Sequence, residues 1–313
     1  MLTQEKSIQV AGFALMDEAE SMLRSGHIQS GMDRLILGMN KIQQNHSPSD
    51  WEIFTKSDCL THSLKTLIHQ CPFTYHSFSK PRGYAGDAEL IDYIYTLKLL
   101  PDDLTELGRE ILNYTIDTPA PRSVRARRDI LAETIDAVAA ASNHPIQILS
   151  VACGHLREAQ KSQAVQSHQI GKFYALDQDP LSIELIDREL VEYSIQTIPN
   201  SVTALVRKKL TFENLDFVYA AGLYDYLSQP FATCLTKVMF DMLCPGGRLL
   251  LANFVPNHLE VGYMETFMQW NLIYRTEAEL EAVAIDIPEA EIASKRTFFE
   301  KEGNIVFLEL VKN

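Results

Sequence analysis

The sequence predicts an α/β protein in which a helical N-terminal domain precedes a mostly parallel sheet. From about Ile146 onward, apolar runs of strand length alternate with stretches of helical character, and this order is typical of a parallel sheet covered by helices. Up to about residue 125, the apolar residues instead recur every three or four positions, which indicates amphipathic helices. Two domains are therefore expected, over residues 1–125 and 126–313.

The helical domain contains two apolar stripes, a marked helix start and one glycine-containing loop. Ser47 and Pro48 supply a hydroxyl cap and a proline at the first helical position. The loop over 80–87 has the Pro and Gly content of a turn, and Asp87 can cap the helix that follows. The stripes consist of Ile28, Met32, Leu35, Met39 and Ile42 and of Leu60, Leu64, Leu67 and Cys71, and the helix after the loop carries Leu90, Ile94 and Leu97.

Six apolar runs are predicted to form the strands of the sheet. The last run follows Glu302-Gly-Asn304, a turn signal, so it is expected to enter the sheet as an antiparallel hairpin partner. Leu243-Cys-Pro-Gly-Gly247 is a helix stop ahead of the fifth run. The runs are Ile146–Val151, Lys172–Leu176, Ile195–Ile198, Phe217–Ala221, Arg248–Phe254 and Ile305–Val311.

Composition excludes several classes of protein. The 313 residues are 46% hydrophobic, enough for one large or two ordinary domains. The formal charge of −13 argues against a broad nucleic-acid surface, which needs a basic face. No apolar run is long enough for a membrane span, no secretion signal is evident, and five irregularly spaced cysteines do not make a disulfide framework. A cytoplasmic protein is therefore expected.

A strand, a tight turn and a second strand with a terminal carboxylate predict half of a nucleoside site. The first run breaks at Ala152-Cys153-Gly154, and the next apolar run ends in Asp177. In this arrangement the carboxylate meets ribose hydroxyls, and the turn lets the backbone approach the ligand. Because Gly154 is the only glycine of the turn and no phosphate-loop motif occurs, a nucleoside cofactor without a pyrophosphate is the better match.

The acid and a second glycine each have an alternative, purely structural role. Asp177 could instead cap a helix, but Asp179-Pro180 is the better pair for a cap and a first helical position. Gly222 could simply permit a tight turn after a buried strand, although the flanking aromatic and acidic residues favour a functional role. The features expected at the carboxyl ends of the strands are Ala152–Gly154, Asp177, Pro199–Ser201, Gly222–Tyr226 and Asn253-Phe254.

This ordered set resembles the class I S-adenosylmethionine-dependent methyltransferases over roughly residues 125–313. Cys244-Pro-Gly-Gly-Arg-Leu-Leu-Leu251 is similar to the approach to the fifth strand in that superfamily. More closely, the chain resembles a bacterial branch with a helical N-terminal domain, some members of which make methyl esters of 3-hydroxy fatty acids. The motifs that carry this second resemblance are Lys80–Asp87, Ala152–Gly154, Ala221–Tyr226 and Trp270–Thr276.

The resemblance implies a Rossmann-like sheet, an S-adenosyl-L-methionine cofactor and a set of cofactor-binding residues. Ala152, Cys153 and Gly154 would lie under the methionine part and the ribose, and Asp177 would accept both ribose hydroxyls. Gln178, Asn200 and Ser201 would contact the adenine, and Ala221 and Gly222 would border the sulfonium. The chain departs from the family at the turn, where two or three glycines and an acid are usual, because it has Ser150, Ala152 and Leu156.

Few catalytic groups are expected, because a sulfonium is an activated methyl donor and positioning of the acceptor can supply most of the acceleration. A carboxylate acceptor needs no base at neutral pH, whereas a hydroxyl or an amine would use one. The candidate catalytic residues are Tyr224, Tyr226 and His258, with His155 and Asp225 as further candidates for bases or orienting groups.

Several residues are candidates for contact with the substrate or for a lid. Arg82 and Tyr84 lie in the 80–87 loop, which could cover a ligand or could be a plain interhelical turn. If a helix starts near Ser123, the cations at its N-terminus call for an anion, such as the cofactor carboxylate, an acidic substrate or an ordinary salt-bridge partner. These cations are Arg122, Arg125 and Arg128. The other candidates for contact with the substrate are Asn253, Phe254 and Arg275. Arg275 could equally be a surface residue, because the next residue, Thr276, is a suitable helix cap.

A metal site is not expected. The cysteines and histidines in the helical domain have spacings that fit no common zinc pattern, and Cys153 at the turn has no His–acid arrangement beside it in sequence. Packing is the better role for these cysteines. The residues considered are Cys59, His62, His69, Cys71 and His76.

The leading hypothesis is a methyltransferase that acts on a small molecule, with O-methylation of an acidic or lipid-like acceptor preferred and the helical domain as lid and substrate pocket. The alternative is a non-catalytic protein that senses S-adenosylmethionine. A nicotinamide oxidoreductase is disfavoured by the missing glycine fingerprint. The sequence leaves the oligomeric state open, and a homodimer is compatible with it.

Overall fold

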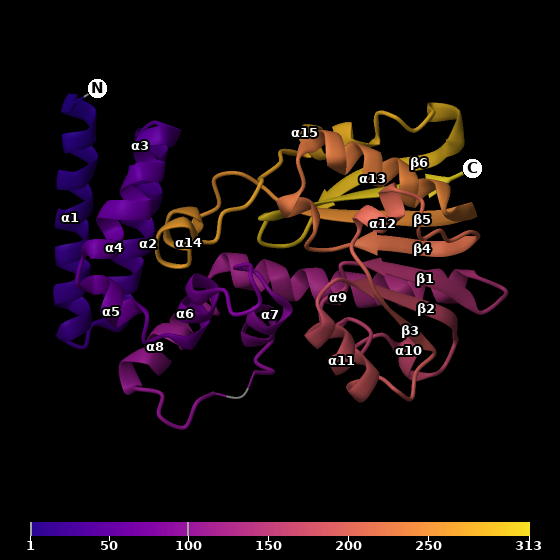
Figure 1. Ribbon diagram of the computed structural model, residues 1–313, viewed down its shortest axis with the longest axis horizontal. Helices are drawn as coiled ribbons and strands as arrows, with labels where there is room; N and C mark the ends of the chain where they lie inside the picture. Colours follow the sequence, from indigo (N-terminus) through magenta and orange to yellow (C-terminus); the bar gives the residue numbers. More distant parts are fainter. Residues whose placement is uncertain (1, 99) are drawn as a thin grey trace. The chain divides into compact units, whose positions relative to one another are not determined.

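The computed structural model describes residues 2–98 and 100–313, with side chains from residue 8 onward. The chain forms two compact units (Figure 1). Unit 1 comprises Met1–Arg122 and Asn257–Asn271, and unit 2 comprises Ser123–Pro256 and Leu272–Asn313. Within the described part of the chain, no helix has the length and apolar character that crossing a membrane requires. The cytoplasmic location stays a prediction.

Unit 1 is helical, as the apolar stripes predict. The stripe from Ile28 to Ile42 forms one face of α2, on which Met32, Leu35, Met39 and Ile42 are buried. Ser47 caps α3 by accepting the Asp50 N–H at 3.2 Å, with Pro48 at the first position. The helices are α1 (Leu2–Arg24), α2 (Ile28–Asn45), α3 (Pro48–Ile53), η1 (Phe54–Asp58), α4 (Cys59–Thr61), α5 (Leu64–Ile68), α6 (Pro72–Ser79), α7 (Ala88–Ile94), α8 (Glu106–Thr115), the start of α9 (Pro119–Ala141), and α14 (Val261–Phe267).

The second predicted stripe is not one helix, which corrects the sequence expectation. The chain leaves helical geometry at His62, whose Nδ1 accepts the Leu64 N–H at 3.1 Å. Cys71 stands ahead of α6 in an extended conformation, because Pro72 disfavours a helical residue before it. Leu64 and Cys71 are nevertheless fully buried, so the pattern identified core residues but not their secondary structure. The helix after the loop likewise ends at Ile94, before Leu97.

Residues 257–271, which the predicted division assigns to the α/β half, pack within unit 1. α14 lies so close to α2 that a Cβ at Gly262 would be 2.7 Å from the Met39 carbonyl carbon. The Tyr263 hydroxyl lies 2.8 Å from Thr74 Oγ1 in a buried contact. The Trp51 indole N–H donates to Glu265 at 2.6 Å. A short connection after the fifth strand thereby completes the helical unit.

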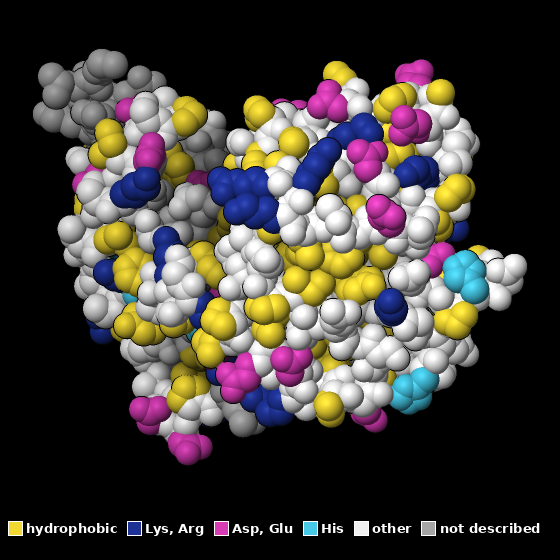
Figure 2. All heavy atoms as spheres, turned by 45° about the vertical axis from the view of Figure 1, so that its right-hand side comes forward, with side chains coloured by type: hydrophobic (Ala, Val, Ile, Leu, Met, Phe, Trp, Pro, Cys, Tyr) yellow, Lys and Arg dark blue, Asp and Glu magenta, His cyan; other side chains and the backbone are white. Residues whose placement is uncertain are grey.

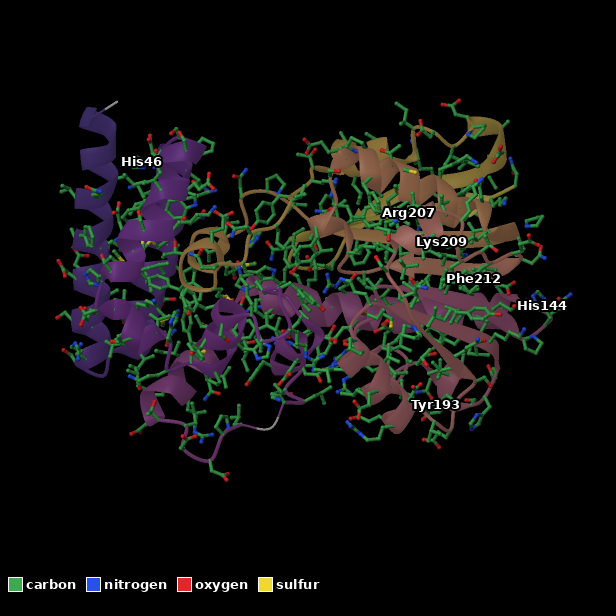
Figure 3. All side chains as sticks on the ribbon, viewed as in Figure 1. His46, His144, Tyr193, Arg207, Lys209 and Phe212 are labelled. Carbon is green, nitrogen blue, oxygen red and sulfur yellow. The ribbon has the colours of Figure 1, made fainter. Side chains whose placement is uncertain are left out.

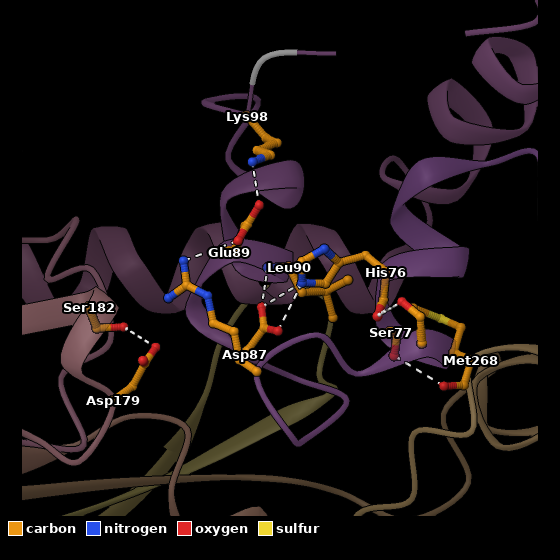
Figure 4. A network of polar contacts seen from close by, with 11 residues as sticks. His76, Ser77, Asp87, Glu89, Leu90, Lys98, Asp179, Ser182 and Met268 are labelled. Atoms are coloured by element: carbon orange, nitrogen blue, oxygen red, sulfur yellow. Dashed lines mark hydrogen bonds and ion pairs between the residues drawn. The ribbon is translucent and has the colours of Figure 1, made fainter. Parts of the chain in front are cut away.

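The loop over 80–87 is fixed at its end by a buried contact between His76 and Asp87 (Figure 4). Asp87 is fully buried and caps α7 by accepting the Leu90 N–H at 2.8 Å, as predicted. His76 Nε2 lies 2.9 Å from both oxygens of the same carboxylate. Arg82 in the loop bonds Glu89 on α7 at 3.1 Å, and Lys98 also pairs with Glu89. These contacts hold the loop against the helix that it precedes.

We expect Asp87→Ala to lower the free energy of unfolding by about 2–4 kcal/mol, because it removes a helix cap and leaves His76 without its carboxylate partner. Urea denaturation followed by circular dichroism measures the change. Asp103→Ala removes an exposed carboxylate from the same unit and should alter the stability by less than about 0.5 kcal/mol. Equal effects of the two substitutions would contradict a stabilising role for the His76–Asp87 pair.

Unit 2 is a seven-stranded sheet in the order β3-β2-β1-β4-β5-β7-β6 (Figure 1). The first five strands in this order are parallel, and β7 is antiparallel to both of its neighbours, which confirms the hairpin expectation. All six predicted runs are strands. The strands are β1 (Ile146–Val151), β2 (Ile170–Asp177), β3 (Ile195–Pro199), β4 (Leu215–Ala220), β5 (Leu243–Phe254), β6 (Ile292–Phe299) and β7 (Ile305–Lys312).

The sequence did not reveal β6, because this edge strand has a polar centre, Ser294-Lys-Arg296, and is exposed along much of its length. Charged side chains on an edge strand discourage pairing with other chains. In contrast, every residue of the central β4 is buried. The helices of unit 2 are the rest of α9, α10 (Gln163–Gln166), α11 (Pro180–Glu189), α12 (Thr203–Val206), η2 (Tyr224–Tyr226), α13 (Gln229–Asp241), α15 (Glu277–Glu281), η3 (Ala282–Ala284) and η4 (Glu289–Glu291).

The start of β1 is fastened to the start of β4 by polar contacts. Asp216 lies in β4 and accepts the Gln147 N–H at 2.7 Å, while His144 Nε2 lies 3.0 Å from its other oxygen (Figure 3). Phe212, just before β4, packs on Tyr174 with ring centroids 4.8 Å apart.

Figure 2 shows Lys and Arg side chains in small groups, with Asp and Glu among them, on the face drawn.

Candidate functional site

The turn after β1 has a backbone that normally requires glycine. Ala152, Gly154 and Leu156 have φ angles of +54°, +56° and +51°. A residue other than glycine pays roughly 1–2 kcal/mol for this left-handed conformation, and such residues concentrate at functional sites. Of the three positions at which the chain departs from the family pattern, Ala152 and Leu156 are left-handed, whereas Ser150 is in β1. The turn of this chain therefore adopts the left-handed conformation with an alanine and a leucine as well as with a glycine.

Asp177, at the end of β2, holds this turn. Its carboxylate accepts the Gly154 N–H at 2.8 Å through one oxygen and the Asp179 N–H at 2.9 Å through the other. Burial raises the pKa of Asp177, and these N–H groups oppose the rise. A carboxylate has about four lone-pair sites, so acceptor capacity remains. The rival capping role belongs to Asp179, which accepts the Leu181 N–H of α11 at 3.0 Å.

The predicted adenine-side residues lie next to the end of β2. The Asn200 N–H donates to the Asp177 carbonyl at 3.0 Å, and Asn200 Oδ1 accepts the Ser201 N–H at 2.9 Å. Gln178 and Asn200 are exposed. The structure thus brings the ends of β1, β2 and β3 together in one place, while contact with an adenine stays a prediction.

Cys153, in the middle of the turn, is not an activated nucleophile. Burial, together with the carboxylates of Asp177 and Glu158, raises the pKa of its thiol. A raised pKa leaves the sulfur protonated at neutral pH, and the thiolate is the reactive form. Cys59 and Cys71 are fully buried in unit 1. Within residues 2–98 and 100–313, no three His, Cys, Asp or Glu residues are grouped as metal ligands.

Arg127, which the sequence did not single out, lies beside the predicted cofactor-binding residues Ala221 and Gly222. Its side chain on α9 is only 7% exposed, and its guanidinium donates to the Ala221 carbonyl at 2.8 Å. A Cβ added to Gly222 would lie 3.7 Å from the same nitrogen. The sequence contains one sign that Arg127 is buried, because it falls within the apolar stripe of α9. This stripe consists of Val124, Leu131, Ile135 and Val138.

The predicted arginines on the same helix have other surroundings. α9 begins at Pro119 rather than near Ser123, which corrects the expected helix start. Arg122 donates to the Asp117 carbonyl at 2.5 Å, and Arg128 pairs with Asp129 at 3.1 Å. Contact of Arg122 or Arg125 with a substrate stays a prediction.

A second unpredicted residue is the buried acid Glu158, two residues after the turn. Glu158 is 7% exposed and accepts the hydroxyl of Tyr219 at 2.7 Å. Tyr219 lies on β4 opposite Ser150 of β1, so this contact is close to the carboxyl ends of both strands. Burial raises the pKa of Glu158, and the charges of Arg127 and Arg128 oppose the rise.

The loop after β4 is tied to the end of β5. Asp225 accepts the Phe254 N–H at 2.8 Å, and its own carbonyl accepts the Ile273 N–H at 2.7 Å. Asn253 is buried and donates to the carbonyls of Phe254 and Ile273, both at 2.9 Å. Burial raises the pKa of Asp225 to about 7, against the opposing charges of Arg127 and Arg275.

Arg275 is buried and serves this loop directly. Its guanidinium donates to the carbonyls of Tyr224 and Leu227, both at 2.6 Å. It also donates to Asn253 Oδ1 at 2.7 Å and Gln229 Oε1 at 2.8 Å. The next residue, Thr276, caps α15 with a complete capping box, as predicted. With four protein acceptors, Arg275 holds the loop after β4 in position. Its contact with a substrate stays a prediction.

The three predicted catalytic side chains occupy different environments. Tyr224 is fully buried in the core, with its hydroxyl 2.7 Å from Thr236 Oγ1. Tyr226 is 40% exposed. His258 belongs to unit 1, where Nδ1 lies 3.3 Å from Glu260. Their catalytic roles, and the lid role of Arg82 and Tyr84, stay predictions.

The buried Asp225 predicts a pH dependence of stability. The pKa rises from 3.8 to about 7 on folding, so between these values the folded protein holds a proton that the unfolded chain has lost. Stability from this group therefore falls as the pH rises from about 4 to 7, by up to about 1.4 kcal/mol per pH unit. Asp225→Asn keeps an acceptor for Phe254 and removes the titration.

The measurement is the free energy of unfolding of wild type and Asp225→Asn across pH 4–8. We expect the advantage of the variant to grow up to about pH 7 and then to level off, because the carboxyl is then ionised in both states. A difference that is constant over the whole range would contradict the raised pKa.

Comparisons with known proteins agree on the fold. No model of a protein family matches the chain, and no curated protein matches it. A solved structure described as a possible exported protein from Bordetella parapertussis is 17% identical, with a TM-score of 0.60, over 86% of this chain and 98% of that chain. A "putative methyltransferase" from Thermobifida fusca YX is 17% identical, with a TM-score of 0.51, over 72% and 94%.

A magnesium protoporphyrin IX methyltransferase from Synechocystis PCC 6803, solved with bound S-adenosylhomocysteine, is more distant. It is 13% identical with a TM-score of 0.45, over 62% of this chain and 87% of that chain. At these identities the likeness concerns the fold. The chain has a seven-stranded, mostly parallel α/β fold preceded by helices, structurally similar at low sequence identity to the class I S-adenosylmethionine-dependent methyltransferases.

Proposed function

We propose that the protein is an S-adenosylmethionine-dependent methyltransferase that methylates an oxygen of a small acidic or lipid-like molecule. The observation that carries the proposal is the left-handed turn at Ala152, Gly154 and Leu156, closed by the buried carboxylate of Asp177. Such a turn lets the backbone approach a ligand, and the carboxylate can accept from two ribose hydroxyls. A single glycine and no lysine argue against a phosphate in the same place.

Gly222 provides an independent test of the fit to a cofactor. Its φ angle is outside the left-handed region, and an added Cβ would meet nothing closer than 3.7 Å. Neither the backbone nor the packing of the protein alone therefore requires glycine here. A ligand that passes between Gly222 and Arg127 would require it, which supports the proposed place of the cofactor at Ala221 and Gly222.

When bound, S-adenosylmethionine supplies an activated methyl group, so the protein's task is positioning. Asp177 would orient the ribose, and the backbone at Ala221 and Gly222 would border the reacting end. Asp225 and Arg275 would keep the loop after β4 in place through their bonds to Phe254, Tyr224 and Leu227. An acceptor carboxylate would need no base.

Two exposed apolar side chains beside this loop support an apolar acceptor. Tyr226 is 40% exposed and Ile273 is 42% exposed. They lie on neighbouring segments, because the Ile273 N–H donates to the Asp225 carbonyl at 2.7 Å. An apolar acceptor could pack on side chains of this kind. The preference for an acceptor oxygen rests on the family resemblance and is open to direct test.

We expect the protein to bind S-adenosylhomocysteine in isothermal titration calorimetry and to ignore NAD. Asp177→Asn should weaken the binding by roughly 10- to 100-fold, because it removes the charge that strengthens the bonds to the ribose hydroxyls. Asp179→Asn changes the neighbouring helix cap and should leave the affinity within about twofold. Affinity for NAD without affinity for S-adenosylhomocysteine would refute the proposed cofactor.

Methyl transfer can be tested with methyl-labelled S-adenosylmethionine and a cell extract. We expect label in apolar small molecules, released as labelled methanol by alkali, as methyl esters require. Gly222→Ala should lower the transfer by roughly 10- to 100-fold through misplacement of the donor, while the thermal unfolding midpoint stays unchanged. Cofactor binding with no methylated product from any extract fraction would favour the sensor hypothesis, and alkali-stable label would contradict an ester.

A further inference from the structure

Three consecutive cations on the surface of unit 2 have no carboxylate partner. Arg207, Lys208 and Lys209 follow α12 and are exposed (Figure 3). In the part of the chain that the structure describes, none of their side chains takes part in an ion pair. The protein has 41 acidic and 28 basic residues, and other cations of unit 2 do pair with carboxylates, among them Arg157, Lys161, Lys237 and Arg296. The protein therefore leaves the charge of this segment uncompensated.

Apolar side chains flank the three cations on the same segment. Val206, Leu210 and Phe212 are partly buried and pack against the core of unit 2. The Phe212 ring contacts Tyr174 on β2. Lys172 is exposed, has no ion pair within the described residues and lies on the same face of β2 as Tyr174, because residues two apart in a strand share a face. We refer to Lys172, Tyr174 and residues 206–212 as the basic face.

The backbone of the basic face is held in place after α12. Lys208 has a φ angle of +54°, the left-handed conformation in which helices commonly end. The N–H groups of Lys209 and Leu210 both donate to the Ala204 carbonyl, at 2.9 and 3.2 Å. The cations therefore project from an ordered turn, so binding a partner requires no folding of the backbone.

We propose that the basic face docks on an anionic lipid surface, with its cations on the head-group phosphates and its apolar side chains at the edge of the acyl layer. Clustered basic residues are attracted to anionic lipids, and apolar side chains among them add the burial that holds a protein at the interface. The inference adds a partner to the proposed function and does not rest on it.

The form of the basic face favours a lipid surface over other anions. Side chains of three consecutive residues in a turn diverge, so they suit several separate phosphates better than one small anion. A single-stranded nucleic acid stacks its bases on exposed aromatic faces, whereas the Phe212 and Tyr174 rings pack on each other with centroids 4.8 Å apart. The formal charge of −13 also opposes a polyanion that extends over the rest of the protein, while a flat bilayer meets one face.

The test is co-sedimentation of the whole protein with vesicles that contain about one-third phosphatidylglycerol in phosphatidylcholine, an anionic surface of the kind that attracts basic residues. We expect the wild type to be retained, and to be released as the salt concentration rises and screens the charges. The triple variant Arg207→Gln, Lys208→Gln, Lys209→Gln should bind about 100-fold more weakly, because each cation near the surface contributes roughly fivefold. Vesicles of phosphatidylcholine alone should retain neither protein.

The matched control is the triple variant Lys41→Gln, Arg109→Gln, Lys301→Gln, which removes the same charge from other exposed positions. It should stay within about twofold of wild type, because charges away from the contact are screened. Equal thermal unfolding midpoints show that both variants are folded. Equal losses in the two variants, or no retention of wild type on the anionic vesicles, would overturn the inference. Tighter binding of single-stranded RNA or of a poly-glutamate peptide than of the vesicles would overturn the lipid assignment.

Discussion

The contact between the Gly154 N–H and the Asp177 carboxylate is the constraint on which the shape of the candidate site depends. It joins the turn after β1 to the end of β2, and the Asn200 N–H adds the end of β3 through the Asp177 carbonyl. A left-handed turn that contains Ala152 and Leu156 is unfavourable by itself. A buried carboxylate that accepts backbone N–H groups offsets part of this strain. The same carboxylate retains acceptor capacity, so one side chain both shapes the turn and remains available to a ligand.

Polar groups buried at the carboxyl ends of the strands also hold the backbone in place, and their burial is itself unfavourable. Arg275 fixes the loop after β4 through backbone carbonyls, and Asp225 fixes it to β5 through the Phe254 N–H. These contacts fix the backbone of the loop after β4 at several points. Preorganised groups of this kind cost no rearrangement when a ligand arrives. The cost is charge buried in an apolar unit, which explains the raised pKa of Asp225.

Periodicity in the sequence predicted most of the fold, because strands buried on both faces are continuous apolar runs and amphipathic helices repeat every three or four residues. β6 was not predicted because its centre is polar. The helix expected over 60–71 is divided at His62 and ends before Pro72, and the spacing of apolar residues does not indicate such local breaks. Asp177 and the turn were found through spacing. Arg127 and Glu158 were not, because burial of a charge depends on packing between segments distant in sequence. Two of the arginines that the sequence did single out have other partners, Arg122 the Asp117 carbonyl and Arg128 the Asp129 carboxylate.

The return of residues 257–271 to unit 1 has a consequence for how the chain is made. During synthesis on the ribosome, α2, α3 and α6 emerge long before α14, which supplies contacts to Met39, Trp51 and Thr74. The helical unit therefore cannot complete its packing until β1 to β5 have also been synthesised. For the same reason, a fragment that ends at Arg122 is not a natural domain, and cutting the chain there would expose apolar surface that α14 covers. The two units are separate as packed bodies yet interleaved as stretches of chain.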